Sequence, residues 1–118
     1  MLLITAFGGC IAMPRAAAKT SYAVEEIRIG ALPAEAREAL ARIDGGAALS
    51  YERDGVVFGN REGLLPAKPR GYYHEYTVKT PGVRTRGSRR IVCGGAVRST
   101  TECYYSNDHY RSFKRITQ

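Results

Sequence analysis

A single carboxylate, Glu75, lies in an aromatic segment that leads into a run of arginines. It is the only acid within residues 71–90, and the four arginines that follow it are Arg84, Arg86, Arg89 and Arg90. A guanidinium group can donate two parallel hydrogen bonds to phosphate oxygens. A carboxylate beside such a group would repel phosphate, but it could remove a proton from a bound substrate. The segment therefore combines a candidate base with candidate phosphate ligands.

The simplest alternative for Glu75 is a surface ion pair. If residues 79–88 form a loop, Arg89 and Arg90 return antiparallel beside Glu75, where opposite charges commonly pair across strands. An exposed pair contributes only about 0–1 kcal/mol. This alternative accounts for one arginine and leaves the others unexplained.

Two of the arginines, Arg86 and Arg90, are the candidate ligands of one phosphate. Their separation along the chain corresponds to about 13 Å in a straight strand. Both can therefore reach one phosphate only if the backbone bends between them, and Gly87 permits such a bend.

His109, in the polar segment NDHYRSF, completes a possible acid–base pair with Glu75. Cleavage of RNA requires a base for the ribose 2′-hydroxyl, cations for the charge on phosphorus, and an acid for the leaving 5′-oxygen. His109 lies in a turn, where functional residues concentrate. His74 alternates to the strand face opposite Glu75 and is interpreted as a bystander.

The segment VVFGNRE could recognise a nucleobase of RNA. Phe58 offers a stacking surface, the backbone at residues 59–60 can present N–H groups, and Glu62 can accept the two donors on the guanine edge. Taken alone, the segment is more typical of an ordinary hairpin loop in which Glu62 is solvated and pairs with Arg61.

The charge of the chain is concentrated in its second half. The net charge is +7, with seven basic and eight acidic residues in 1–67 against eleven basic and three acidic residues in 68–118. A basic half of a small domain suggests a polyanionic partner, either nucleic acid or an acidic membrane surface.

The elements that would position these residues are one helix followed by strands. Within IRIGALPAEAREALARIDGG, Pro33 suits the first helical position, an apolar stripe recurs every three or four residues, and Gly45–Gly46 ends the helix. Strands are expected at 53–58, 71–78, 89–93, 102–106 and 111–116. The predicted fold is α+β, with a single N-terminal helix packed on one face of a five-stranded antiparallel sheet.

The first residues differ from the rest of the chain. Residues 1–18 contain a short apolar run followed by small residues, which is typical of a signal peptide, so a secreted protein is expected. Residues 19–26 are interpreted as a tether and residues 27–118 as the functional domain.

Cysteine spacing is consistent with export. After removal of the signal peptide, Cys93 and Cys103 remain as a candidate disulfide, whereas in a cytosolic protein they would be buried free thiols. The cysteine and histidine spacing fits no zinc site.

Four stretches in this order resemble the microbial guanyl-specific ribonucleases related to barnase. They are ALPAEAREAL, DGVVFGNREGLLP, GYYHEYTVKTPGVRTRGSRRI and DHYRSF, and the resemblance extends from about residue 29 to residue 116. It implies a metal-independent endoribonuclease, without cofactor, that cleaves single-stranded RNA 3′ to guanosine through a 2′,3′-cyclic phosphate. It departs at residue 28, where close relatives have a cysteine and this chain has arginine.

By this resemblance, Glu75 would be the general base and His109 the general acid. Arg86 and Arg90 would stabilise the transition state and Tyr110 would contact phosphate. The residues of the guanine site would be Phe58, Asn60, Arg61 and Glu62.

Two other readings remain open. The domain could bind RNA or another polyanion without cleaving it, or the same chemistry could serve as a contact-delivered toxin. The protein is expected to be a monomer without a membrane segment in its mature form. Relatives that would harm their host are often matched by a small acidic inhibitor, which a basic site around Arg84–Arg90 would suit.

Overall fold

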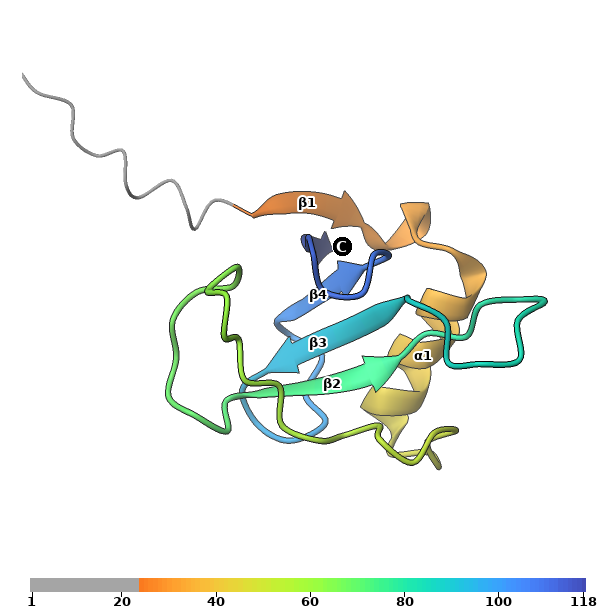
Figure 1. Ribbon diagram of the computed structural model, residues 1–118, viewed down its shortest axis with the longest axis horizontal. Coiled ribbons are helices and arrows are strands. Elements are labelled where there is room, and N and C mark those ends of the chain that lie inside the picture. The colour runs from red at the N-terminus through yellow and green to blue at the C-terminus, as the bar shows by residue number, and fades with distance from the viewer. Residues whose placement is uncertain (1–23) are drawn as a thin grey trace, which may run out of the picture.

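The computed structural model describes residues 24–118 (Figure 1). Five strands form one sheet in the order β1-β5-β4-β3-β2, and one α-helix packs against it. The strands are β1 (Glu25–Arg28), β2 (Tyr73–Thr77), β3 (Arg90–Gly94), β4 (Cys103–Ser106) and β5 (Lys114–Thr117), and the helix α1 spans Ala34–Gly45. The expected signal peptide and the first part of the expected tether lie outside the described residues.

Helix α1 begins one residue after the predicted first position, Pro33, and ends at the predicted glycine pair. Pro33 precedes its first residue and Glu35 lies in its first turn, where a negative charge is favourable. Its C-cap residue, Gly46, has φ +71°, and its N–H donates to the carbonyl groups of Arg42 and Ile43. Leu32 is extended, because a residue that precedes proline is disfavoured in the α conformation, and Ile29–Ala31 form a short 3-10 helix.

The prediction of a fully antiparallel sheet is wrong in one strand. Residues 53–58 contain turns and a single bridge from Val57 to His74, since the turn at Gly55, with φ +90°, interrupts any regular strand. The fifth strand is instead β1, which pairs parallel to β5, so the sheet is mixed. Strand β1 also includes residues 25–26, which the sequence assigned to the tether.

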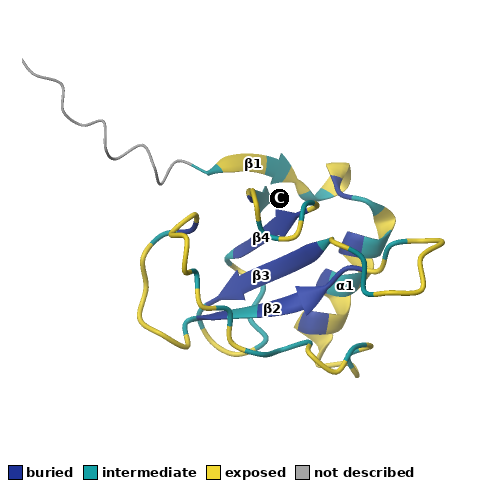
Figure 2. Cartoon of the chain, viewed as in Figure 1, coloured by how far each residue is buried: buried dark blue, intermediate teal, exposed yellow. Residues whose placement is uncertain are grey.

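The strands β2, β3 and β4 are mostly buried on both faces, whereas the edge strand β1 is mostly exposed (Figure 2). On one face, Tyr76 packs with the helix residues Ala36, Leu40 and Ile43. On the other face, Tyr73 packs in a second cluster, which also contains Leu65, Val92, Tyr104 and Phe113. The predicted alternation along β2 is therefore confirmed, and Glu75 belongs to the face that the helix leaves free.

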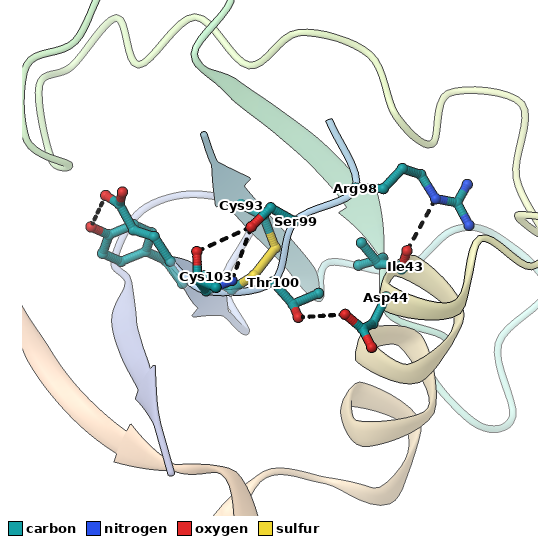
Figure 3. The surroundings of a disulfide bond; sticks show 10 residues. Ile43, Asp44, Cys93, Arg98, Ser99, Thr100 and Cys103 are labelled. Atoms are coloured by element: carbon teal, nitrogen blue, oxygen red, sulfur yellow. Dashed lines mark hydrogen bonds between the residues drawn. A yellow bond between two sulfur atoms is a disulfide. The ribbon is translucent and has the colours of Figure 1, made fainter. Parts of the chain in front are cut away.

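A disulfide joins Cys93 and Cys103, which lie directly opposite each other on β3 and β4 (Figure 3). The predicted pairing is thus present. The loop that it closes is attached to the end of α1, because Arg98 donates to the carbonyl of Ile43 at 3.1 Å and to that of Arg42 at 2.8 Å. Both carbonyl groups also accept from backbone N–H groups that follow the helix, so Arg98 gives each a second donor and attaches the loop to the helix end.

Replacing both cysteines by alanine is expected to lower the free energy of unfolding by about 2–3 kcal/mol, mainly because the unfolded chain gains freedom. Urea unfolding of the double variant measures this change. Catalytic turnover at 25 °C should remain within about twofold, since Arg90 and Ser106 lie at the opposite end of the β3–β4 pair. A larger loss of turnover in the folded variant would show that the disulfide supports the site directly.

Candidate active site

Glu75 lies in the middle of β2 and is 7% exposed. Its backbone is held on both sides. On one side it pairs with Val92 of β3. On the other side its carbonyl accepts from the Gly55 N–H at 2.8 Å, and its N–H donates to the Val56 carbonyl at 2.9 Å. A carboxylate on a fixed strand has little freedom to move. The strand thus places a candidate base on the sheet face that carries no helix.

Arg90, the first residue of β3, is 2% exposed. Its Nη1 donates to the carbonyl oxygens of Gly87 at 3.1 Å and Arg89 at 2.8 Å, and its Nε donates to the Tyr110 hydroxyl at 3.1 Å. The Tyr110 hydroxyl in turn donates to Oε1 of Glu75 at 2.6 Å. Tyr110 therefore connects the buried arginine to the candidate base.

Arg86 approaches the same carboxylate from the loop between β2 and β3. Its Nη2 lies 3.5 Å from Oε1 of Glu75. The loop turns at Gly87, where φ is +70° and an added Cβ would lie 2.6 Å from Oγ1 of Thr80. The predicted bend is present; Arg86 approaches Glu75 directly, whereas Arg90 is connected to it through Tyr110.

The Tyr110 hydroxyl remains protonated over the physiological range. Burial raises the pKa of Tyr110, and its hydrogen bond to the Glu75 carboxylate raises it further, to about 12, against the opposing effect of Arg90. A protonated hydroxyl can donate to Glu75 while accepting from Arg90. The group is thus suited to hold the carboxylate and the guanidinium in fixed positions, and it could donate to a phosphate oxygen only by releasing its bond to Glu75.

The loop after β4 presents His109 and Tyr110 in an unusual conformation. Both residues have positive φ, +58° and +74°, which is uncommon for residues other than glycine. The Ser106 hydroxyl accepts from the Tyr110 N–H at 2.9 Å, and the Ser88 carbonyl accepts from the His109 N–H at 2.9 Å. This loop leaves the His109 ring exposed beside Tyr110, with ring centroids 4.9 Å apart.

Asp108 stabilises this loop by accepting hydrogen bonds from several of its residues. It accepts hydrogen bonds from the N–H groups of Arg111 and Ser112 and from the hydroxyls of Ser106 and Ser112. Partial burial would raise the pKa of Asp108, but the bonds from Ser112 and Ser106 outweigh it and lower the pKa below its usual value. The strained conformation is therefore maintained by a charged acceptor.

The loop predicted to recognise a nucleobase, residues 58–62, begins beside Tyr110. The rings of Phe58 and Tyr110 lie 5.1 Å apart, with an angle of 31° between their planes. Arg61 and Glu62 are exposed, and neither forms an ion pair within the described part of the chain. The pair between Glu62 and Arg61 in the hairpin alternative is therefore absent from the described residues, although Glu62 is exposed as that alternative expects.

The side chain of Asn60 is used within the loop. Its Nδ2 donates to the Leu65 carbonyl at 3.0 Å, and its Oδ1 accepts from the Leu65 N–H at 3.1 Å. The φ angle of Asn60 is +51°. The side chain thus shapes the loop, and its backbone is what remains to face a ligand.

The structure adds two residues that the sequence interpretation did not select. Thr77 accepts from Arg86 at 2.7 Å, and Asp54 lies 3.9 Å from the same guanidinium. Thr77 could have been found, since it shares the strand face of Glu75. No sequence pattern places Asp54 there. Arg89, in contrast, is directed to Glu35 of α1 at 3.9 Å.

Within residues 24–118, no group of three or more His, Cys, Asp and Glu side chains could hold a metal ion. No helix in that same range is long and apolar enough to cross a bilayer.

The chain matches known proteins over most of its length. A family model described as ribonuclease matches residues 15–117. The chain is 54% identical to guanyl-specific ribonuclease Sa3 and 53% identical to guanyl-specific ribonuclease Sa, both from Kitasatospora aureofaciens; the matches cover 80% and 76% of this chain and 64% and 91% of those proteins. The structure of ribonuclease Sa2 with guanosine-2′-cyclophosphate superposes with a TM-score of 0.72 at 47% identity, covering 80% of this chain and 96% of that one.

Proposed function

This chain belongs to the family of microbial guanyl-specific ribonucleases, and from that premise we propose that it is a guanyl-preferring endoribonuclease. Its substrate would be single-stranded RNA, cleaved 3′ to guanosine. The observation that carries the proposal is the convergence of Arg86, Tyr110 and, through Tyr110, Arg90 on the buried Glu75 carboxylate. A carboxylate so placed can take a proton next to a site for a phosphate.

The first step would be transfer of the 2′-hydroxyl proton to Glu75 as the 2′-oxygen attacks phosphorus. Charge then builds on the phosphoryl oxygens, where Arg86 and Arg90 can stabilise it because their positions are already fixed. His109 would protonate the leaving 5′-oxygen. The product is a 2′,3′-cyclic phosphate, which a water molecule would open in a second step with Glu75 and His109 exchanging roles.

Cleavage of short RNAs that contain one guanosine tests the proposal. The purified protein, with EDTA present, should give a fragment that ends in guanosine 2′,3′-cyclic phosphate. Bound but intact RNA would instead favour the non-catalytic RNA-binding reading. Cleavage without regard to guanosine would contradict the assigned preference.

For guanine recognition, we expect Glu62 to accept the N1–H and N2–H donors of the base while Phe58 stacks on it. Glu62→Gln should lower the preference for guanosine over adenosine by roughly 10- to 100-fold, the size of a lost hydrogen bond to a charged group. The ratio of kcat/KM for two dinucleotides that differ only in this base measures the effect. Glu38→Gln, an exposed change on α1, is the control and should leave the ratio unaltered.

We also propose that the protein is exported. Support comes from the disulfide between Cys93 and Cys103, a bond that persists in oxidising compartments. Mass spectrometry of the mature protein would show whether the chain begins after Ala18. An intact N-terminus in a cytosolic fraction would contradict the proposal.

A further inference from the structure

Arg86 lies on an exposed loop, yet its guanidinium is bonded on one edge. The loop between β2 and β3 spans residues 78–89 and extends beyond the end of the sheet (Figure 1). A long side chain in such a loop has many rotamers, and ordering it costs free energy. The neighbouring Arg84 is exposed and has no such contacts within the described residues. Something specific must therefore hold Arg86.

The holding group is the hydroxyl of Thr77. Its Oγ1 accepts from Nε of Arg86 at 3.0 Å and from Nη2 at 2.7 Å. Thr77 is the last residue of β2, is 6% exposed, and lies two residues from Glu75 on the same face. One edge of the guanidinium is thus fixed to the strand that carries the base.

Asp54 fixes Thr77 and adds charge. Its Oδ1 accepts from the Thr77 N–H at 2.7 Å and lies 3.9 Å from Nη2 of Arg86, and its side chain is 4% exposed. A buried carboxylate needs a nearby cation or hydrogen-bond donors, and both are present. Asp54 lies in the irregular segment beside β2, so the contact joins two segments far apart in the sequence.

We infer that Thr77, supported by Asp54, is a positioning residue for Arg86 in the proposed ribonuclease reaction, and this inference rests on that proposed function. It holds Nε and Nη2 and leaves Nη1, which has no hydrogen-bond partner among the described residues, to face a phosphoryl oxygen. Arg90 is fixed in a different way, by backbone carbonyls and Tyr110. The two arginines therefore depend on separate supports.

Thr77→Val and Thr77→Ser form a matched pair of variants. Valine keeps the shape and removes the acceptor, whereas serine keeps the acceptor. We expect Thr77→Val to lower kcat on a guanosine-containing dinucleotide by roughly 10- to 100-fold, as for loss of a hydrogen bond to a charged group. KM should rise by less than about threefold, because charge on the phosphoryl oxygens is largest in the transition state. Thr77→Ser should recover most of the loss.

A spectroscopic readout separates positioning from general destabilisation. In ¹⁵N-edited spectra, the Nε–H of Arg86 should exchange faster with water in Thr77→Val than in the unaltered protein. The Nε–H of Arg90, bonded to Tyr110, is the internal control and should not change. Equal effects on both arginines would overturn the inference, as would a serine variant as impaired as the valine variant.

Asp54→Asn supplies a second, milder variant. Asparagine can still accept from the Thr77 N–H, so the fold should be retained while the charge beside Arg86 is lost. We expect kcat to fall by roughly 2- to 10-fold with faster exchange of the Arg86 Nε–H. An unchanged kcat together with an unchanged exchange rate would remove Asp54 from the inference.

The proposed function and the positioning inference can fail separately. If the unaltered protein does not cleave RNA, the proposed function is wrong, and the arginine exchange rates still test the contact. If it cleaves after guanosine and Thr77→Val is equally active, only the positioning inference is wrong.

Discussion

Replacing Glu75 by glutamine is expected to lower kcat on guanosine-containing RNA by roughly 10²- to 10⁴-fold. The amide has nearly the same shape as the carboxylate, but it cannot accept the 2′-hydroxyl proton at neutral pH. Binding should survive, since Arg86, Arg90 and Tyr110 all remain. Steady-state kinetics with a guanosine dinucleotide measure kcat, and fluorescence titration with a non-cleavable 2′-deoxy analogue measures affinity.

Glu102→Gln is the matched control for this prediction. Glu102 is also partly buried and accepts a hydrogen bond from a tyrosine, since the Tyr104 hydroxyl donates to its Oε2 at 2.8 Å. It precedes β4, near Gly94 at the far end of β3 from Arg90. We expect kcat of the Glu102→Gln variant to remain within about twofold of that of the unaltered protein. If both variants lost activity equally, the effect at Glu75 would be one of packing and the assignment as base would be wrong.

The part of the site that could be predicted is the part encoded locally. Glu75 and the arginines lie within one β-hairpin, so the antiparallel return brings Arg90 opposite Thr77, on the strand face of Glu75. Gly87 marks the bend, because its position between Arg86 and Arg90 requires a conformation that glycine adopts readily. The helix was equally predictable, since Pro33 and Gly46 delimit a regular apolar stripe.

The remaining features depend on contacts between distant segments. The bond from Tyr110 to Glu75 joins positions 35 residues apart, and that from Asp54 to Thr77 joins positions 23 apart. Strand β1 was missed because an edge strand of four residues carries little periodic signal, and its pairing is with the last strand of the chain. The segment at 53–58 has strand-like composition, but the Asp54–Gly55 turn allows it only one bridge to β2.

Replacing His109 is expected to lower kcat on guanosine-containing RNA by roughly 10²- to 10⁴-fold, the range expected for Glu75→Gln. The reason differs from that for Glu75. Here the lost group is the acid that protonates the departing 5′-oxygen. Asparagine is the suitable replacement, because residue 109 has φ +58° and asparagine tolerates positive φ better than most residues. His74→Asn is the control: this histidine lies on β2 and points to the face opposite Glu75, so its variant should retain full turnover.

A change of leaving group separates the acid from the base. In an aryl ester of guanosine 3′-phosphate, the leaving phenolate is stable without a proton, so the reaction no longer needs an acid. His109→Asn should therefore recover roughly 10- to 100-fold of its lost activity on this ester, whereas Glu75→Gln should recover none, since the 2′-hydroxyl still needs a base. Recovery in both variants, or in neither, would contradict the division of roles. Such a result would leave Arg86, Arg90 and Tyr110 as the groups that account for catalysis through charge stabilisation alone.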